Sequence, residues 1–261
     1  MGLDYPGLLA DLRHESEQLV SCLSGLSATQ WNLATPAAGW NIQDQVSHLA
    51  FFDDIARLAL SDPERFRRKA DDLMAGGMNF PDRIAAEYRT KTSKEILEWF
   101  VEARPQLLTA FAGNDPARRL PWFGPDMSVA SSATARLMET WAHGQDVYDT
   151  LAMPHPPSPG LRNIAHLGVA TFAFAHSIHG IDVPDQRVRI ELYSPEGEVW
   201  PWGPDNSDNR IEGPAQDFVL TVTQRRHWTE TALTVRGAVA KRWLDIAQAF
   251  AGAPSRRTVP R

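Results

Sequence analysis

The chain has 261 residues, of which 43% are hydrophobic and 22% charged, and its formal net charge is −6. This composition is normal for a globular protein with one or two domains. The acidic balance argues against a general nucleic-acid or anionic-membrane binder. The single cysteine, Cys22, excludes an intramolecular disulfide and fits a reducing cytosol. Since neither a signal peptide nor a transmembrane run is recognisable, we expect a cytoplasmic protein.

The N-terminal part of the chain has the spacing of amphipathic helices. Asn41 is a suitable N-cap for the second helix, and Pro105 predicts a kink or break of the third helix near Arg104. Four long helices with short connections predict a four-helix bundle over residues 1–155. The predicted helices cover residues 3–25, 42 onward, 81–111 and 128–151.

The C-terminal part changes character after a proline-rich joint at residues 153–160. A helix over about 161–180 lies in an expected connecting segment, residues 156–182. RVRIELYSP and EGEVWPWG then predict a hairpin, DFVLTVTQ and TALTVRG predict two further strands, and AVAKRWLDIAQAFAG predicts a closing helix. We therefore expect an α+β protein: a helical bundle, a small α+β domain over residues 183–253, and a disordered tail over 254–261.

The most informative local pattern is Glu139 and His143, four residues apart on one helix face. His48 on the second helix would add a third ligand, because bundles commonly build metal sites from facing helices. Three protein ligands with an open position are typical of catalytic zinc. The same ligands also suit Fe²⁺, Ni²⁺ or Mn²⁺. The alternative is an exposed Glu–His pair on a solvated helix surface. His176 and His179 form a weaker metal candidate, since no carboxylate lies near them in the sequence.

Two further polar residues share this face of the predicted fourth helix. Asp146 could accept a hydrogen bond from a ligating imidazole, as outer partners of metal ligands usually do. Arg136 could hold a substrate carboxylate through a bidentate ion pair, or else form an ordinary salt bridge. The face is therefore either a functional cleft or a solvated surface.

The segment WNIQDQVSHLA resembles the second-helix motif of the DinB-like proteins. PWFGPDMS, followed by ARLMETWAHGQDVYDTLAMP, resembles their mycothiol-dependent maleylpyruvate isomerase branch. The resemblance implies a DinB-like bundle whose metal is held by His48, Glu139 and His143. It also implies an activity-linked arginine in the C-terminal domain, which matches Arg225, with Arg226 as the neighbouring alternative. The C-terminal segment is similar to an uncharacterised metal-binding subgroup of the family.

These observations predict a metal-dependent isomerase or S-transferase that uses mycothiol and acts on a small electrophilic, carboxylate-bearing molecule. A metal-bound thiol would favour its thiolate form, which is the nucleophile. The alternatives are thiol-independent chemistry, by activated water or by Lewis-acid polarisation, and a non-catalytic protein that binds a metal or a small ligand. Cys22 fits a packed residue better than a catalytic thiol. The expected partners are a small-molecule substrate and a low-molecular-weight thiol, with no nucleic acid or membrane; the oligomeric state is left open.

Overall fold

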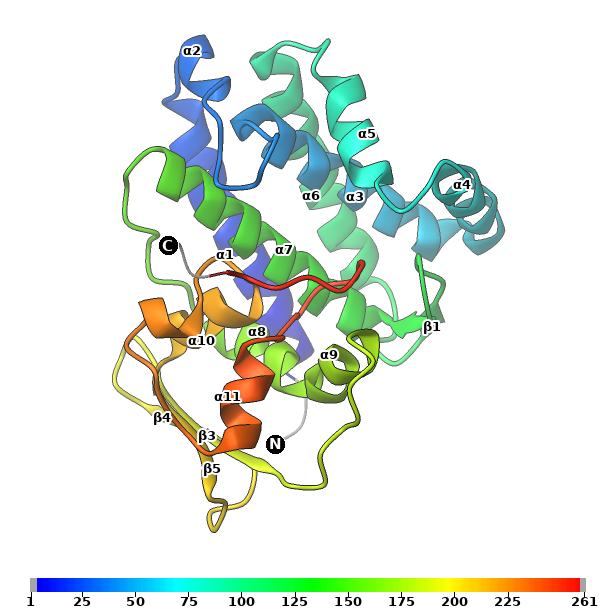
Figure 1. Ribbon diagram of the computed structural model, residues 1–261. Coiled ribbons are helices and arrows are strands. Elements are labelled where there is room, and N and C mark those ends of the chain that lie inside the picture. The colour runs from blue at the N-terminus through cyan, green and yellow to red at the C-terminus, as the bar shows by residue number, and fades with distance from the viewer. Residues whose placement is uncertain (1–3, 259–261) are drawn as a thin grey trace. The chain divides into compact units, whose positions relative to one another are not determined.

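The computed structural model describes residues 4–258, which divide into two compact units at the boundary between Ser158 and Pro159. The first unit is helical and the second combines helices with a small sheet (Figure 1). The predicted α+β class, a DinB-like helical bundle with a small α+β domain, is confirmed. Most of the expected connecting segment, residues 156–182, therefore belongs to the second unit.

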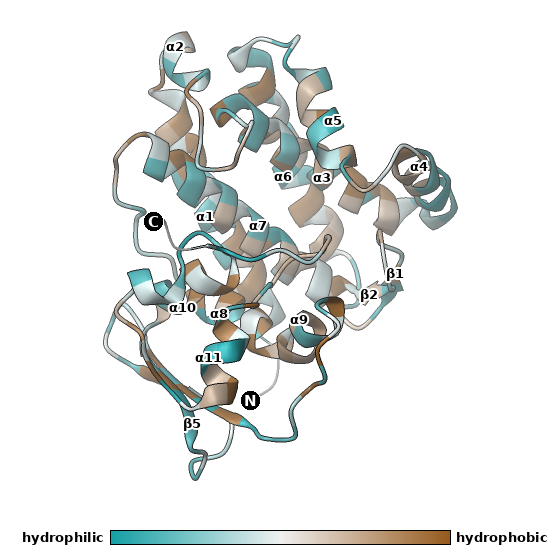
Figure 2. Cartoon of the chain, viewed as in Figure 1, coloured by the Kyte–Doolittle hydropathy of each residue, from teal (hydrophilic) through white to brown (hydrophobic). Residues whose placement is uncertain are grey.

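Four long helices build the first unit, as the sequence predicts. They are α1 (Tyr5–Ser24), α3 (Ile42–Ser61), α6 (Ser93–Ala112) and α7 (Val129–Thr150). Helices α1 and α3 each pack against both α6 and α7. Hydrophobic and hydrophilic residues alternate along these helices (Figure 2). Their apolar faces contribute to a buried core of Leu19, Leu23, Trp31, Ile42, Val46, Leu49, Ala50, Ile96, Phe100 and Val147.

The helix ends follow from local capping. Asn41 caps α3, and its side chain and that of Asp44 form a reciprocal capping box. Thr92 and Glu95 do the same for α6, so the predicted single helix over 81–111 is wrong: the chain forms α5 (Phe80–Tyr88) and then restarts. Helix α6 continues through Pro105, so the predicted break does not occur there. The shorter elements are α2 (Ala28–Trp31), α4 (Pro63–Ala75), β1 (Arg119–Leu120) and β2 (Met127–Ser128).

The second unit is built around a four-stranded sheet in the order β4-β3-β5-β6. Strands β3 (Val188–Tyr193) and β4 (Val199–Trp202) form the predicted antiparallel hairpin, whereas β5 (Asn209–Pro214) runs parallel to β3. Strand β6 (Thr234–Arg236) lies within the predicted TALTVRG segment and pairs antiparallel with β5. The helices are α8 (Leu161–Ala170), α9 (Phe172–Ile178), α10 (Ala215–Val222), the 3-10 helix Trp228–Glu230 and α11 (Ala238–Leu244).

One strand prediction in this unit is wrong. DFVLTVTQ contributes to helix α10, which buries Ala215, Phe218, Val219 and Val222, the spacing of one helix face. A short run rich in apolar and β-branched residues does not by itself distinguish a strand from a buried helix. In the tail, Ser255 is hydrogen-bonded to Gln248 and Gln224, and residues 259–261 lie outside the described part. Within residues 4–258, no helix is long and apolar enough to cross a membrane.

Candidate metal centre

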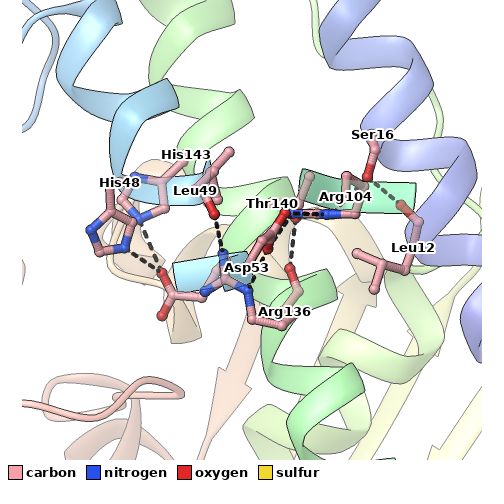
Figure 3. Close-up of polar contacts among 10 residues, drawn as sticks. Leu12, Ser16, His48, Leu49, Asp53, Arg104, Arg136, Thr140 and His143 are labelled. Atoms are coloured by element: carbon pink, nitrogen blue, oxygen red, sulfur yellow. Dashed lines mark hydrogen bonds and ion pairs between the residues drawn. The ribbon is translucent and has the colours of Figure 1, made fainter. Parts of the chain in front are cut away.

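Helices α3 and α7 bring the three predicted ligands together. The Nε2 atom of His143 lies 3.0 Å from Oε2 of Glu139, and the Nε2 atom of His48 lies 3.5 Å from the same oxygen. The two imidazole rings are 4.5 Å apart between centroids, and Figure 3 shows them side by side. We call His48, Glu139 and His143 the acceptor triad, since a carboxylate oxygen and two imidazole nitrogens converge there.

A chain of hydrogen bonds sets the tautomer of His143. Thr35 Oγ1 donates to the carbonyl of Trp40 at 3.0 Å, so it is free to accept from the side-chain amide of Gln45 at 2.8 Å. That arrangement turns Oε1 of Gln45 towards Nδ1 of His143. Because an amide oxygen only accepts, Nδ1 of His143 must carry a proton. In the neutral ring, Nε2 therefore presents a lone pair to the centre of the triad.

Burial and mutual charge set the protonation of the triad. Burial and, to a smaller extent, the neighbouring His143 together lower the pKa of His48 to about 4, against the opposing effect of Glu139. Burial alone would raise the pKa of Glu139, but the contacts of its carboxylate with His143 and His48 lower the pKa well below its usual range. At neutral pH the triad thus presents a carboxylate anion and a neutral His48, the forms in which both groups bind metals.

Aromatic rings surround the two histidines. Trp40 stacks on His143 with 5.8 Å between centroids and an interplanar angle of 15°, and its indole N–H donates to Asp82. Phe52 lies 4.6 Å from the His48 ring and also contacts Phe123. These rings shield the imidazoles, whose side chains are each 11% exposed, whereas the Glu139 side chain is 24% exposed. Access from solvent is therefore greatest beside the carboxylate.

The triad fits a divalent metal ion. Its three ligand atoms lie within 4.8 Å of one another. Ligand atoms in a tetrahedral zinc shell are about 3.3–3.5 Å apart, close to the two distances from Glu139 to the histidines. The Nδ1 atom of His48 is buried and has no hydrogen-bond partner among residues 4–258, so no second contact fixes which nitrogen of that ring carries the proton. With Nε2 turned to Glu139, the ring is oriented for coordination.

Arg136, a predicted substrate-binding residue, is instead buried in an ion-pair network with Asp53 and Arg104. Its Nε atom donates to Asp53 at 3.1 Å, and Arg104 donates to both oxygens of that carboxylate at 2.6 and 3.0 Å. Arg104 also donates to Ser16 and Thr140. We call Asp53, Arg104 and Arg136 the Asp53 network (Figure 3). It links α1, α3, α6 and α7, so Arg136 already has its carboxylate partner inside the bundle.

The remaining predicted residues lie elsewhere. Asp146 is buried on α7, and its hydrogen bond to a ligating imidazole stays a prediction. The partner of Nδ1 of His143 is Gln45. Arg225 and Arg226 belong to the second unit and follow α10, the helix that replaces the predicted strand. Their guanidinium groups donate to the backbone oxygens of Thr223 and Arg225, respectively. His176 and His179 are not part of a group of three metal-binding side chains among residues 4–258.

Sequence reasoning missed Gln45, Trp40 and Asp53. Gln45 precedes His48 by three residues and so borders the same helix face, which was a usable signal. Its partner His143 is 98 positions away, and no local pattern predicts that contact. Trp40 precedes the N-cap of α3 and reaches the triad because the 35–40 loop folds back, with Thr35 N–H bonded to the Trp40 carbonyl.

Comparisons with known proteins find a matching family model, similar sequences and similar folds. Residues 12–148 match the model of the mycothiol maleylpyruvate isomerase N-terminal domain. Uncharacterized proteins from two strains of Mycobacterium tuberculosis are each 42% identical over 252 residues, which cover 96% of this chain and 98% of each relative. A crystal structure of the mycothiol-dependent maleylpyruvate isomerase covers 89% of this chain and 93% of its own, with a TM-score of 0.59 and 12% identity. A histidine-to-alanine mutant of that isomerase gives a TM-score of 0.58 at 15% identity, over 86% of this chain and 90% of its own.

Proposed function

The chain belongs to the family that carries the mycothiol maleylpyruvate isomerase N-terminal domain, and from this premise we propose that it is a metal-dependent isomerase or S-transferase that uses mycothiol. Its substrate would be a small electrophilic molecule that bears a carboxylate. The observation that carries the proposal is the acceptor triad, in which two imidazoles and one carboxylate converge within 4.8 Å. Such an arrangement of acceptors requires a proton or a cation at its centre.

The protein residues have distinct parts in this proposal. His48, Glu139 and His143 would hold a divalent ion, Zn²⁺ or else Fe²⁺, Ni²⁺ or Mn²⁺, whose positive charge would favour thiolate over thiol. Gln45 keeps the proton of His143 on Nδ1, and Trp40 holds that ring by stacking. Trp40 and Phe52 exclude water from the imidazoles, which strengthens electrostatic interactions at the site.

The reaction would use the thiolate as the nucleophile. Its sulfur adds to one carbon of an activated double bond, and the π electrons move to the conjugated carbonyl group. Rotation about the resulting single bond, followed by elimination of the same thiolate, would give isomerisation. Retention of the new C–S bond, with protonation of the enolate carbon by water, would give transfer. Arg225 or Arg226 is the proposed partner of the substrate carboxylate, since a guanidinium binds a carboxylate through two parallel hydrogen bonds.

Metal content and thiol binding test the proposal together. We expect about one metal per chain in the wild type, and calorimetric binding of mycothiol that depends on it. The double variant Glu139→Ala/His143→Ala should lose both. The matched control is His14→Ala/Glu17→Ala, which removes the same residue types from exposed positions of α1 and should lose neither.

Each other outcome has a definite meaning. Metal that binds without mycothiol would overturn the thiol chemistry and leave water activation or Lewis-acid polarisation for the same site. Full metal content in the double variant would overturn the assignment of the ligands. No metal in either protein after reconstitution with Zn²⁺, Fe²⁺, Ni²⁺ or Mn²⁺ would overturn the metalloenzyme itself.

A further inference from the structure

A cavity of about 400 Å³ lies among α3, α4, α5 and α6 of the first unit. None of the acceptor triad lines it. The cavity is lined by residues such as Phe51 and Leu58 of α3, and by the cations Arg65 and Lys69 of α4. Its volume is within the range of small-molecule sites, which is about 300–1,000 Å³.

The floor and one wall of the cavity suit a flat apolar group. Phe51 and Ile55 are buried, and they form the floor with Leu58. The rings of Tyr88 and Trp99 pack at 4.6 Å between centroids, and Tyr88 also lies 6.2 Å from Phe51. Aromatic side chains in this arrangement offer ring faces and edges for offset or edge-to-face contacts with a planar ligand.

The polar groups at the cavity have an excess of positive charge. Its single acid, Asp54, accepts from Arg57 at 3.1 Å and from the Trp99 indole at 2.8 Å. Arg65 and Lys69, one helical turn apart, form no ion pair with any acid among residues 4–258. Lys69 Nζ lies 5.7 Å from the centre of the Phe51 ring, directly at the apolar floor.

The Tyr88 hydroxyl adds a third donor at the same cavity. It makes no hydrogen bond to another residue of the described range 4–258. An ammonium group, a guanidinium group and a phenolic hydroxyl are therefore available beside an aromatic floor, in a chain whose net charge is −6. Local positive charge on an acidic protein attracts an anion and repels cations, which gives selectivity as well as affinity.

We propose that this cavity binds an aromatic monocarboxylate, with its ring against Phe51 and its carboxylate between Arg65 and Lys69. Burial of the ring supplies hydrophobic stabilisation, and charge-assisted hydrogen bonds orient the anion. The site is separate from the metal centre and takes no part in the proposed thiol chemistry. A ligand held there would contact α3 on the segment that follows His48, between residues 51 and 61.

The test is calorimetric titration of 2-naphthoate into the full chain. The double variant Arg65→Met/Lys69→Met should bind it at least about tenfold more weakly, because two charge-assisted contacts are lost. Arg67→Met/Arg68→Met removes the same charge from exposed positions of α4 that do not line the cavity, and should bind as the wild type does. Neutral 2-naphthylmethanol should also bind about tenfold more weakly.

A second variant tests the position of the ligand. Leu58→Trp, at a half-buried residue of the cavity, should fill the space and abolish binding while circular dichroism stays unchanged. In contrast, His48→Ala/His143→Ala should bind 2-naphthoate normally. The proposal would be overturned if the two α4 double variants bound with equal affinity or if binding survived Leu58→Trp. Loss of binding in the histidine variant, or no binding to the wild type, would overturn it as well.

Discussion

Helices α3 and α7 contribute to two polar clusters, and the balance of donors and acceptors in the two clusters is opposite. The Asp53 network also includes Arg104 of α6. In the Asp53 network, two guanidinium groups surround one carboxylate, and Arg104 also donates hydrogen bonds to Ser16 and Thr140. In the acceptor triad, one carboxylate faces two imidazole nitrogens, and Gln45 fixes one ring as a lone-pair donor towards the centre. The first cluster is satisfied by the chain itself, whereas the second needs a proton or a cation at its centre.

Exposure follows the same division. Asp53, Arg104 and Arg136 are 0%, 3% and 2% exposed, so the network is closed to ligands. The Glu139 side chain keeps 24% of its surface accessible, so the triad can be reached from solvent. A buried charge that is paired with an opposite charge of the protein stabilises one packing of the helices. Converging acceptors beside solvent instead form a binding site. Residue type alone does not distinguish the two, since Arg136 and Glu139 are three positions apart.

The largest effect is expected when the closed cluster loses its only carboxylate. Asp53→Asn should lower the free energy of unfolding by about 3–5 kcal/mol, because two buried guanidinium groups lose their counter-charge. Urea unfolding of the metal-free protein measures this change in the free energy of unfolding. Asp71→Asn, at an exposed position of α4, is the control and should change stability by no more than about 0.5 kcal/mol. Similar small losses in both variants would show that the Asp53 network does not hold the bundle together.

A smaller effect is expected at the outer partner of the triad. Gln45→Leu removes the acceptor from His143 and should weaken zinc binding about 10–100-fold, the usual cost of losing a hydrogen-bond partner of a metal ligand. Competition with a chromophoric chelator measures the affinity. Gln45→Glu keeps an oxygen at the same place and should retain most of the zinc affinity of the wild type. If Leu and Glu at this position gave the same affinity, the tautomer of His143 would not depend on residue 45.

The sequence was sufficient for the parts of the molecule that depend on local signals. Asn41 marked the start of α3, and the four-residue spacing of Glu139 and His143 placed both on one face of α7. The Thr92–Glu95 capping box was also visible, but the apolar period continued across it and two helices were merged into one. Helix α4 was not separated from the second predicted helix, although Phe66, Ala70, Leu73 and Met74 have the spacing of one amphipathic helix face.

What the sequence could not reveal depends on distant contacts. DFVLTVTQ has the composition of a strand, and only packing against α8 and β5 makes it the helix α10. Strand β5 lacks a run of β-branched residues and exists because β3 and β6 pair with it. The Asp53 network unites residues 51 and 83 positions apart, so an arginine on the triad's helix face was predicted as a ligand-binding group. Whether a charged side chain finds its counter-charge inside the protein depends on the packing of the folded chain.

The most gradual predicted effect is the pH dependence of the triad. Burial lowers the pKa of His48 from 6.5 to about 4, so between these values the unfolded chain binds a proton that the folded chain does not. The free energy of unfolding of the metal-free protein should therefore fall as the pH is lowered through this window, by at most about 1.4 kcal/mol per pH unit. His48→Gln should remove this part of the slope, and His14→Gln, at an exposed histidine, should keep it. Bound zinc should steepen the loss, since protons compete with the metal for the imidazoles. Identical slopes for the wild type and His48→Gln would show that His48 is not held neutral by its surroundings, and the contrast with the Asp53 network would then rest on geometry alone.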